Sequence, residues 1–162
     1  ESLWSQLLSK AIAGEMVRTE LVQVKSSRVK WQTWQKKNPD TLVLSTDTGY
    51  VRDYTTDPYE GYYRIGTIWF PVGKVRKDLP PKARVLGLEI KSATRAYPLT
   101  KLQKEKGTIN DQLSGVKILI SLNNDGEVVE VADDKGKPIP HLFAFWFAWQ
   151  AFNPETTVYG IK

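Results

Sequence analysis

The sequence contains one pattern twice, and this pattern decides how the chain can fold: Trp31-Gln-Thr-Trp34-Gln-Lys-Lys-Asn38-Pro39-Asp40-Thr41-Leu-Val43 and Trp146-Phe-Ala-Trp149-Gln-Ala-Phe-Asn153-Pro154-Glu155-Thr156-Thr-Val158. Two Trp, Asn-Pro, an acidic residue, Thr and Val recur at identical spacing without a gap. Two segments that match at so many positions without a gap are not expected by chance. We therefore interpret the pattern as a structural device that the chain uses twice.

Chain geometry predicts a helix, a stop and a strand in each copy. Two Trp three residues apart lie on one face of a helix, Asn tolerates the backbone that closes a helix, and Pro prevents its continuation. The acidic residue and Thr favour a turn, so we expect strands at 41–45 and 156–160. Because large aromatic side chains mostly serve cores, we expect both Trp pairs to pack rather than to form a platform for a sugar or another ligand.

The rest of the chain is typical of short strands joined by turns. Apolar runs and alternations predict strands at 20–25, 84–91, 93–97, 108–111, 116–122 and 127–131, and amphipathic stretches predict helices at 3–10 and 99–106. Asn124-Asp125-Gly126 is a strong hairpin signal. We therefore expect an α+β, β-rich fold with a mainly antiparallel sheet, short helices and two related half-units.

We expect one compact domain over residues 1–162. Residues 1–45 would end a first repeat unit, 83–162 would form the second, and 46–82 would be a long connection rich in Tyr and Pro. A connection of this length is uncommon unless it is functional or packs as an ordered excursion. Because the chain begins at Glu1 without a targeting segment, we also expect it to be a piece of a longer protein.

Composition excludes several classes of protein. With 41% hydrophobic and 25% charged residues, the chain can bury a core. Its longest apolar run, 142–149, is far shorter than the roughly 20 residues that cross a bilayer, so we expect no membrane span. The net charge is +5, but the basic residues are scattered, which argues against nucleic acid as a partner. The absence of Cys excludes disulfides and thiolate sites.

No signature of a cofactor or metal site is present. The sequence has no phosphate-binding glycine loop, EF-hand spacing or nucleophile elbow, and His141 is its single histidine. We therefore expect no cofactor and no metal, and we assign no catalytic residue. We interpret His141 as a structural residue that caps the aromatic helix.

Two groups of residues are candidates for binding a ligand. In the Tyr-rich connection, Tyr offers flat amphipathic contact area, and Arg with Asp offers directed hydrogen bonds. Its members are Arg52, Asp53, Tyr54, Asp57, Tyr59 and Tyr62. The second group consists of Arg95, Tyr97, Asn110 and Asp111. Structural explanations compete in both places, since Asp side chains close turns and Tyr rings seal loops onto sheets.

Further short motifs extend over nearly the whole chain: Ser2-Leu-Trp-Ser-Gln6, Ala11-Ile-Ala-Gly14, Trp31-x-x-Trp34 with Asn38-Pro-Asp-Thr41, Arg52-Asp-Tyr54, Asp57-Pro-Tyr59, Phe70-Pro-Val72, Leu79-Pro-Pro-Lys82, Arg84-Val-Leu-Gly87, Arg95-Ala-Tyr-Pro-Leu99, Asn110-Asp111 and Phe145-Trp-Phe-Ala-Trp149. With these motifs the chain resembles the C-terminal portion of the family called domain of unknown function 3179. The resemblance implies an extracytoplasmic protein, periplasmic or extracellular, with an additional upstream part that contains Cys. Asn38 and Asn153 stand where many relatives of that family have His.

Three kinds of function stay open. The favoured one is a non-catalytic extracytoplasmic binding or assembly domain that meets an unknown protein, a small polar ligand, an upstream segment or a neighbouring subunit. It requires exposed aromatic side chains such as Tyr59 and Tyr62. The second is a hydrolase that needs two of Asp53, Asp57 and Asp111, or one of them with His141, to converge in a pocket. The third is a structural subunit of a larger envelope or filament complex, with strand edges paired to another chain.

Overall fold

The computed structural model describes residues 1–24, 26, 29–69 and 71–161. Its elements follow in the order β1 (Ser2–Ser5), β2 (Lys10–Gly14), α1 (Trp31–Lys37), α2 (Glu60–Arg64), β3 (Arg84–Ile90), β4 (Ala93–Pro98), α3 (Leu99–Leu102), β5 (Thr108–Leu113), β6 (Val116–Leu122), β7 (Val128–Ala132), β8 (His141–Phe145), α4 (Trp146–Phe152) and β9 (Thr157–Val158). Sheet A is β1-β2, sheet B has the order β8-β3-β4-β9, and sheet C has the order β5-β6-β7. Neighbouring strands are antiparallel except for β4 and β9. The predicted α+β fold with mainly antiparallel sheets is confirmed.

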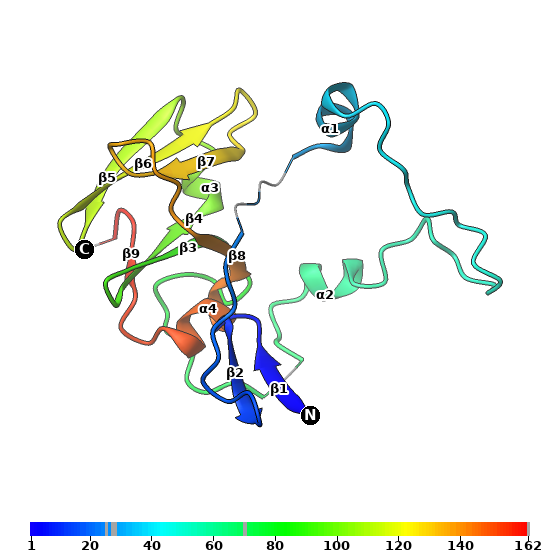
Figure 1. The fold of residues 1–162 in the computed structure, drawn as a ribbon, viewed down its shortest axis with the longest axis horizontal. Coiled ribbons are helices and arrows are strands. Elements are labelled where there is room, and N and C mark those ends of the chain that lie inside the picture. Colours follow the sequence, from blue (N-terminus) through cyan, green and yellow to red (C-terminus); the bar gives the residue numbers. More distant parts are fainter. Residues whose placement is uncertain (25, 27–28, 70, 162) are drawn as a thin grey trace.

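Sheet B is the middle layer, between sheet C and α4 (Figure 1). Successive side chains of a strand point to opposite faces, and β3 uses both. Leu86 and Leu88 join the core with sheet C, whereas Val85 packs with Ala96 and Trp149 in the core beneath α4. Because both faces are covered, β3 appears in the sequence as an almost continuous apolar run.

Gly87 lets α4 approach sheet B closely. A Cβ atom at this position would lie 2.4 Å from ring carbons of Trp149, well inside van der Waals contact. Trp149 is only 3% exposed and Trp146 is 0% exposed. The second Trp pair is therefore part of the core, and its position depends on the missing side chain of Gly87.

The two copies of the Trp pattern have the same local conformation. Each helix has seven residues, and the closing Asn has φ −135° and ψ 71° in the first copy and φ −130° and ψ 66° in the second. The indole N–H of Trp34 donates to the Thr41 hydroxyl at 2.9 Å, and that of Trp149 donates to the Thr156 hydroxyl at 2.9 Å. In both copies the Asn side chain donates to the carbonyl of the second Trp, at 3.2 and 3.1 Å.

The copies differ in their surroundings. Trp31 and Trp34 are 48% and 45% exposed, and residues 41–45 form no strand, so the strand predicted there is wrong. Thr157 and Val158 do form a strand, because they pair with Arg95 and Ala96 on β4. A strand needs a neighbouring strand for its hydrogen bonds, and the described part of the chain offers none beside residues 41–45.

Several predicted elements need correction. Residues 3–10 do not form a helix but belong to the hairpin of β1 and β2, since cross-strand pairs satisfy their backbone groups. In the predicted strand 20–25, Glu20 forms only an isolated bridge with Lys10, and Lys25 lies outside the described residues. The helix predicted at 99–106 ends at Leu102 and continues as single turns. His141 begins strand β8 and does not cap α4.

Residues 31–69 are called the arm below. Its first part, with α1 and the loop that follows, stands away from the sheets (Figure 1), whereas α2 lies beside β8, where the Tyr63 and Phe145 ring centres are 6.3 Å apart. Lys82 joins the arm to the body. Its Nζ donates to the carbonyl oxygens of Tyr62 and Ile65 at 2.5 and 2.8 Å, and it lies 3.4 Å from the centre of the Tyr62 ring. Desolvation lowers the pKa of Lys82 below its ordinary value. The only regular elements of the arm within the described residues are α1 and α2.

The Gly87 contact makes a first testable prediction. We expect Gly87→Ala to lower the free energy of unfolding by about 3 kcal/mol, because the added Cβ must displace the Trp149 ring. Gly73→Ala is the matched control, since a Cβ there would meet no atom within 4 Å. Urea denaturation followed by circular dichroism measures both, and equal midpoints for the two variants would contradict the role given to Gly87.

Candidate functional site

Three members of the second predicted site come together between sheets B and C. The Nη1 group of Arg95, on β4, donates to both carboxylate oxygens of Asp111, on β5, at 2.8 and 2.6 Å. The Tyr97 hydroxyl donates to Oδ2 of Asp111 at 2.7 Å. Asn110 is exposed and stays outside this cluster, because adjacent residues of a strand face opposite sides.

This cluster satisfies its own charges. Burial by itself would raise the pKa of Asp111, but hydrogen bonds from Arg95, Tyr97 and the backbone of Gln112 outweigh it and lower that pKa. Burial and the hydrogen bond to Asp111 raise the pKa of Tyr97. Arg95 also donates from Nε to the Thr157 hydroxyl at 3.0 Å. The cluster therefore links β4, β5 and β9, and we interpret it as a structural link, called the Arg95–Asp111 clamp below.

The first predicted site does not form one convergent group. Both carboxylate oxygens of Asp53 accept hydrogen bonds from Thr55 and Thr56, and these bonds lower the pKa of Asp53 to about 2. The other polar members also contact near neighbours: Tyr54 with the Thr48 hydroxyl at 2.7 Å, Asp57 with the Tyr59 backbone N–H at 2.8 Å, and Arg52 over the Tyr50 ring at 5.7 Å. Contacts of this kind close turns.

The two tyrosines on which the binding hypothesis depends have opposite environments. Tyr59 is 55% exposed, whereas Tyr62 is 7% exposed. The Tyr62 ring packs on Trp69, with the ring centres 4.6 Å apart, and its hydroxyl has no hydrogen-bond partner within the described residues. Tyr59 therefore belongs to the surface of the arm, and Tyr62 belongs to the joint between arm and body.

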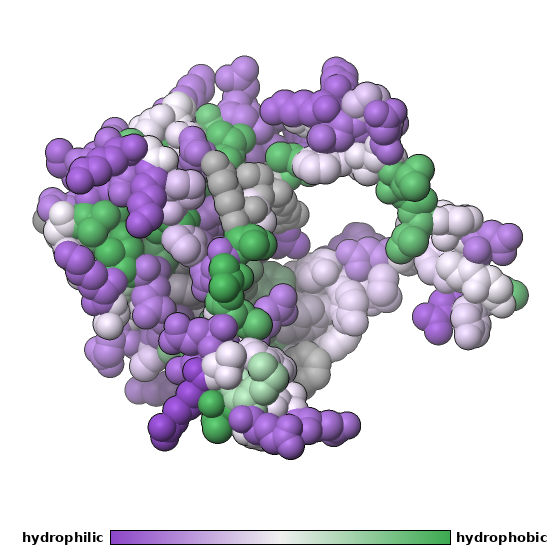
Figure 2. All heavy atoms as spheres, viewed as in Figure 1, coloured by the Kyte–Doolittle hydropathy of each residue, from purple (hydrophilic) through white to green (hydrophobic). Residues whose placement is uncertain are grey.

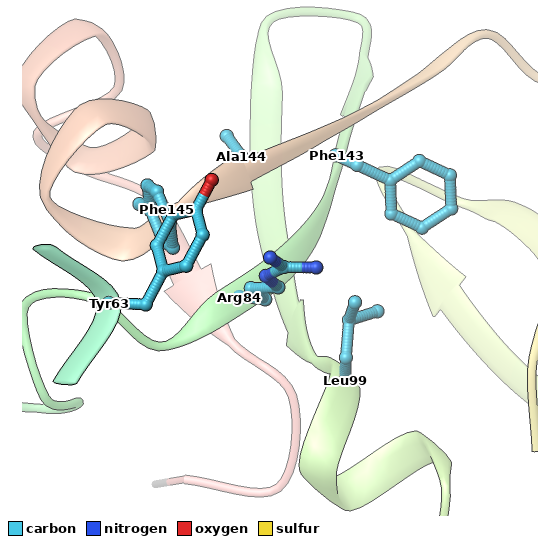
Figure 3. Close-up of a pocket in the computed structure, with 6 residues that line it drawn as sticks. All are labelled: Tyr63, Arg84, Leu99, Phe143, Ala144 and Phe145. Carbon is cyan, nitrogen blue, oxygen red and sulfur yellow. The ribbon is translucent and has the colours of Figure 1, made fainter. Parts of the chain in front are cut away.

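A groove between α2, α3 and β8 was not predicted from the sequence (Figure 3). Its first part is a cavity of about 240 Å³ lined by Tyr63, Arg84, Leu99, Phe143, Ala144 and Phe145. The guanidinium carbon of Arg84 lies 5.8 and 5.9 Å from the centres of the Tyr63 and Phe145 rings. Figure 3 shows this guanidinium reaching into the space between Tyr63 and Leu99. Within the described residues it has no hydrogen bond or ion pair to a side chain or carbonyl.

The groove continues into a second cavity of about 420 Å³, which shares Arg84, Leu99 and Phe143 with the first and adds Lys82 and Glu127 at its wall. Together the two cavities, called the Arg84 groove below, reach the size range of small-molecule sites. The alternation of Phe143 and Phe145 along β8 was the sequence signal for it. No strand is predicted at 141–145 from the sequence, so the common face of Phe143 and Phe145 on β8 was missed.

The groups that a hydrolase would need have local hydrogen-bond partners. Asp53 and Asp111 use their oxygens on the partners given above, and the Nδ1 atom of His141 lies 3.1 Å from the Ile139 carbonyl. His141 also makes an edge contact with the Phe143 ring at 5.6 Å. Among the residues that the structure describes, no group of three or more His, Cys, Asp or Glu side chains is placed to hold a metal ion.

The chain matches the model of the family described as protein of unknown function (DUF3179) over residues 1–156, and it belongs to that family. Searches of curated proteins and of solved structures found no match. None of the helices in the described part of the chain has both the length and the apolar character to cross a membrane.

The Arg95–Asp111 clamp predicts a pH dependence of stability. Because the pKa of Asp111 is lowered on folding, its contribution is present above the ordinary carboxyl pKa and is lost as the pH falls through the lowered value. We expect Asp111→Asn to lower the free energy of unfolding at neutral pH by about 2 kcal/mol and to flatten its fall in acid. Urea titrations between pH 2 and pH 7 measure this.

Asp40→Asn is the control for the clamp. Asp40 is exposed on the arm, and exposed charges contribute little, so the stability of this variant should follow that of the wild type at every pH. A clamp variant with an unchanged acid profile would show that Asp111 is not held as described.

Proposed function

We propose that the chain is a non-catalytic binding or assembly domain that acts outside the cytoplasm, and that its arm is the surface which another protein covers. The extracytoplasmic location rests on the resemblance of the sequence to a family of secreted and periplasmic proteins. The binding role rests on the arm itself. A part of the same proposal is that the two Trp patterns are copies of one structural repeat.

The exposure of apolar side chains along the arm carries this proposal. Leu42 and Leu44 are 95% and 96% exposed, and Tyr50, Val51 and Tyr54 are exposed as well. Figure 2 shows hydrophobic residues along the arm, with an opening between it and the body. Exposed apolar surface that is grouped in one region marks sites of protein association. Covering a side chain such as Leu44 contributes about 2 kcal/mol.

The joint between arm and body supports the same view. The arm is held by Lys82 at one end and by an exposed ion pair of Lys30 with Asp125 at the other, at 2.9 Å. Exposed ion pairs contribute little stability, and no sheet covers the residues between these anchors. An arm that is held only at its two ends can present its apolar side chains to a partner while the sheets of the body keep their conformation.

The arm predicts that its exposed apolar side chains bind a hydrophobic dye. Leu44→Ser with Tyr50→Ser and Val51→Ser should reduce the binding of this dye, since the apolar area is lost. The melting temperature should stay unchanged, because none of these side chains is buried.

The matched control for the arm is Val22→Ser, which changes an equally exposed apolar residue outside it. This control should behave like the wild type in both measurements. If the wild type binds no more dye than the triple variant, the arm is not an association surface.

The Arg84 groove favours a second form of binding, that of a small polar ligand. Within the described residues the Arg84 guanidinium has no acidic partner, and it lies beside the Tyr63 and Phe145 rings. Such a group suits a carboxylate joined to a flat apolar group. The two open cavities beside Arg84, of about 240 and 420 Å³, have room for one ring and a short chain. This observation supports an acidic aromatic or short aliphatic ligand, and it does not depend on the arm tip.

Benzoate is the probe for the groove. We expect it to shift the backbone amide signals of Tyr63, Arg84 and Phe145 in NMR spectra of the whole chain, whereas neutral benzamide should not. Arg84→Gln should abolish the benzoate shifts, because the charge is lost. Equal shifts by benzoate and benzamide would leave Arg84 without a role in recognition.

A further inference from the structure

The first Trp unit, residues 31–43, has the same residue types as the second, residues 146–158, at every position that is buried in the second. The buried residues of the second unit are Trp146, Trp149, Gln150, Thr156 and Val158. The first unit has the same residue type at each of these positions: Trp31, Trp34, Gln35, Thr41 and Val43. Yet in the first unit the indole rings are about half exposed, and Val43 is exposed too. The first unit therefore has the side chains of a buried unit without the surface that buries it.

The positions at which the two units differ also indicate that the first unit has the side chains of a buried unit. Lys36 and Lys37 stand where the second unit has Ala151 and Phe152, and all four are exposed. Leu42 stands opposite Thr157, which is also exposed. Thus the residue types of the two units differ at positions that are exposed or partly exposed in the second unit, and they are identical at the positions that are buried there. Large apolar side chains are common in buried positions and uncommon on a surface that stays in water. A unit that is exposed in its working state would therefore not be expected to have both indoles and Val43 at the positions that are buried in the second unit.

The surroundings of α4 show what such a unit requires. Sheet B presents Gly87 to the second indole, at a distance that excludes a Cβ. The edge of β4 pairs in parallel with Thr157 and Val158. The segment that contains Arg76 supplies a carbonyl, that of Arg76 itself, to the first indole N–H at 3.1 Å.

The same segment closes over the end of the unit. The Nη1 group of Arg76 donates to the carbonyl oxygens of Pro154 and Thr156 at 2.9 and 2.6 Å. Its guanidinium also lies over the Trp146 ring, 5.3 Å from the centre. A surface that buries a unit of this kind therefore combines a glycine on a sheet face, a free strand edge and a basic strap.

We infer that the first unit, residues 31–43, is built to seat on a partner β-sheet of the same design as sheet B. That sheet would place a glycine beneath Trp34, offer a free strand edge to Leu42 and Val43, and supply a carbonyl to the Trp31 indole N–H. This inference rests on the proposed binding function and names what the first part of the arm binds.

Sheet B of the same chain is not the partner. Its face is filled by α4, whose Trp146 and Trp149 are buried there, and its β4 edge is taken by β9. A second copy of this chain presents the same filled surface, so it could accept the first unit only by releasing its own α4. The partner is therefore a sheet whose corresponding face and edge are open.

A graft within the full chain tests whether the first unit fits such a sheet. The substitutions Phe147→Gln, Ala148→Thr, Ala151→Lys, Phe152→Lys, Glu155→Asp and Thr157→Leu give α4 and β9 the sequence of the first unit. We expect the grafted chain to fold, with Trp146 and Trp149 as protected from hydroxyl radicals as in the wild type. Mass spectrometry of the footprinted chain reads each Trp separately.

A second variant separates misfit from a general loss of stability. The graft that keeps Phe147, Ala148 and Thr157 retains the stacking of Phe147 on Phe145, whose ring centres are 6.0 Å apart, and the hydrogen bond from Arg95 to the Thr157 hydroxyl. If Trp149 becomes open to radicals in this variant as well, the first unit does not fit a sheet of this design and the inference is overturned. Adding Trp149→Gln to the full graft is the control, because it removes a shared buried residue and should open the site.

The wild-type chain distinguishes the partner sheet from a second copy. We expect the radical labelling of Trp31 and Trp34 to stay at the level of their 48% and 45% exposure at all protein concentrations, because no open sheet is present. Protection of these two with simultaneous exposure of Trp146 and Trp149 would identify exchange between copies and overturn the inference. The graft experiment measures the packing of Trp146 and Trp149 inside one chain, whereas the arm experiment measures the exposed apolar surface of the arm. A failure of the inference can therefore be told from a failure of the proposed function.

Discussion

The contact of the Trp149 indole with Gly87 determines the arrangement of the whole body of the molecule. It sets the distance between α4 and sheet B, because only a residue without a side chain leaves room for the ring. From that position the indole N–H reaches the Thr156 hydroxyl, which places the next two residues on the edge of β4. The segment with Arg76 then closes over the helix. Each later contact depends on the close approach at residue 87.

Much of this fold could be predicted from the sequence, where local signals and tertiary needs agree. The runs at β3, β4 and β6 and the turn at Asn124-Asp125-Gly126 gave the antiparallel sheets, and the Trp pattern gave both helices with their closing Asn. The prediction failed where a strand depends on a partner. Residues 41–45 have the composition of a strand but no edge to join, and residues 3–10 have the spacing of a helix but pair across a hairpin. Periodicity carries no information about pairing.

The candidate sites show the same division. Arg95, Tyr97 and Asp111 could be grouped from the sequence because Arg95 and Tyr97 share one face of a strand and Asp111 lies on the next strand. Their polar groups, however, form hydrogen bonds with one another and make the Arg95–Asp111 clamp. Tyr62 could not be told from Tyr59, since a Tyr beside Gly and Pro suits a surface as well as a seal. The Arg84 groove was out of reach because its walls come from α2, α3 and β8, which lie far apart in the sequence. Within the part of the chain that the structure describes, the Arg84 guanidinium has aromatic neighbours but no acidic partner, and composition does not show that.

The joint at Lys82 has a thermodynamic consequence. One ammonium group binds two carbonyl oxygens at the end of α2 and faces the ring of Tyr62, while the arm extends well beyond this point (Figure 1). Because the other end of the arm is tied by the ion pair of Lys30 with Asp125, the arm is a loop anchored at two points. Such a loop loses less conformational entropy on binding than a free tail of the same length, since both of its ends are already fixed.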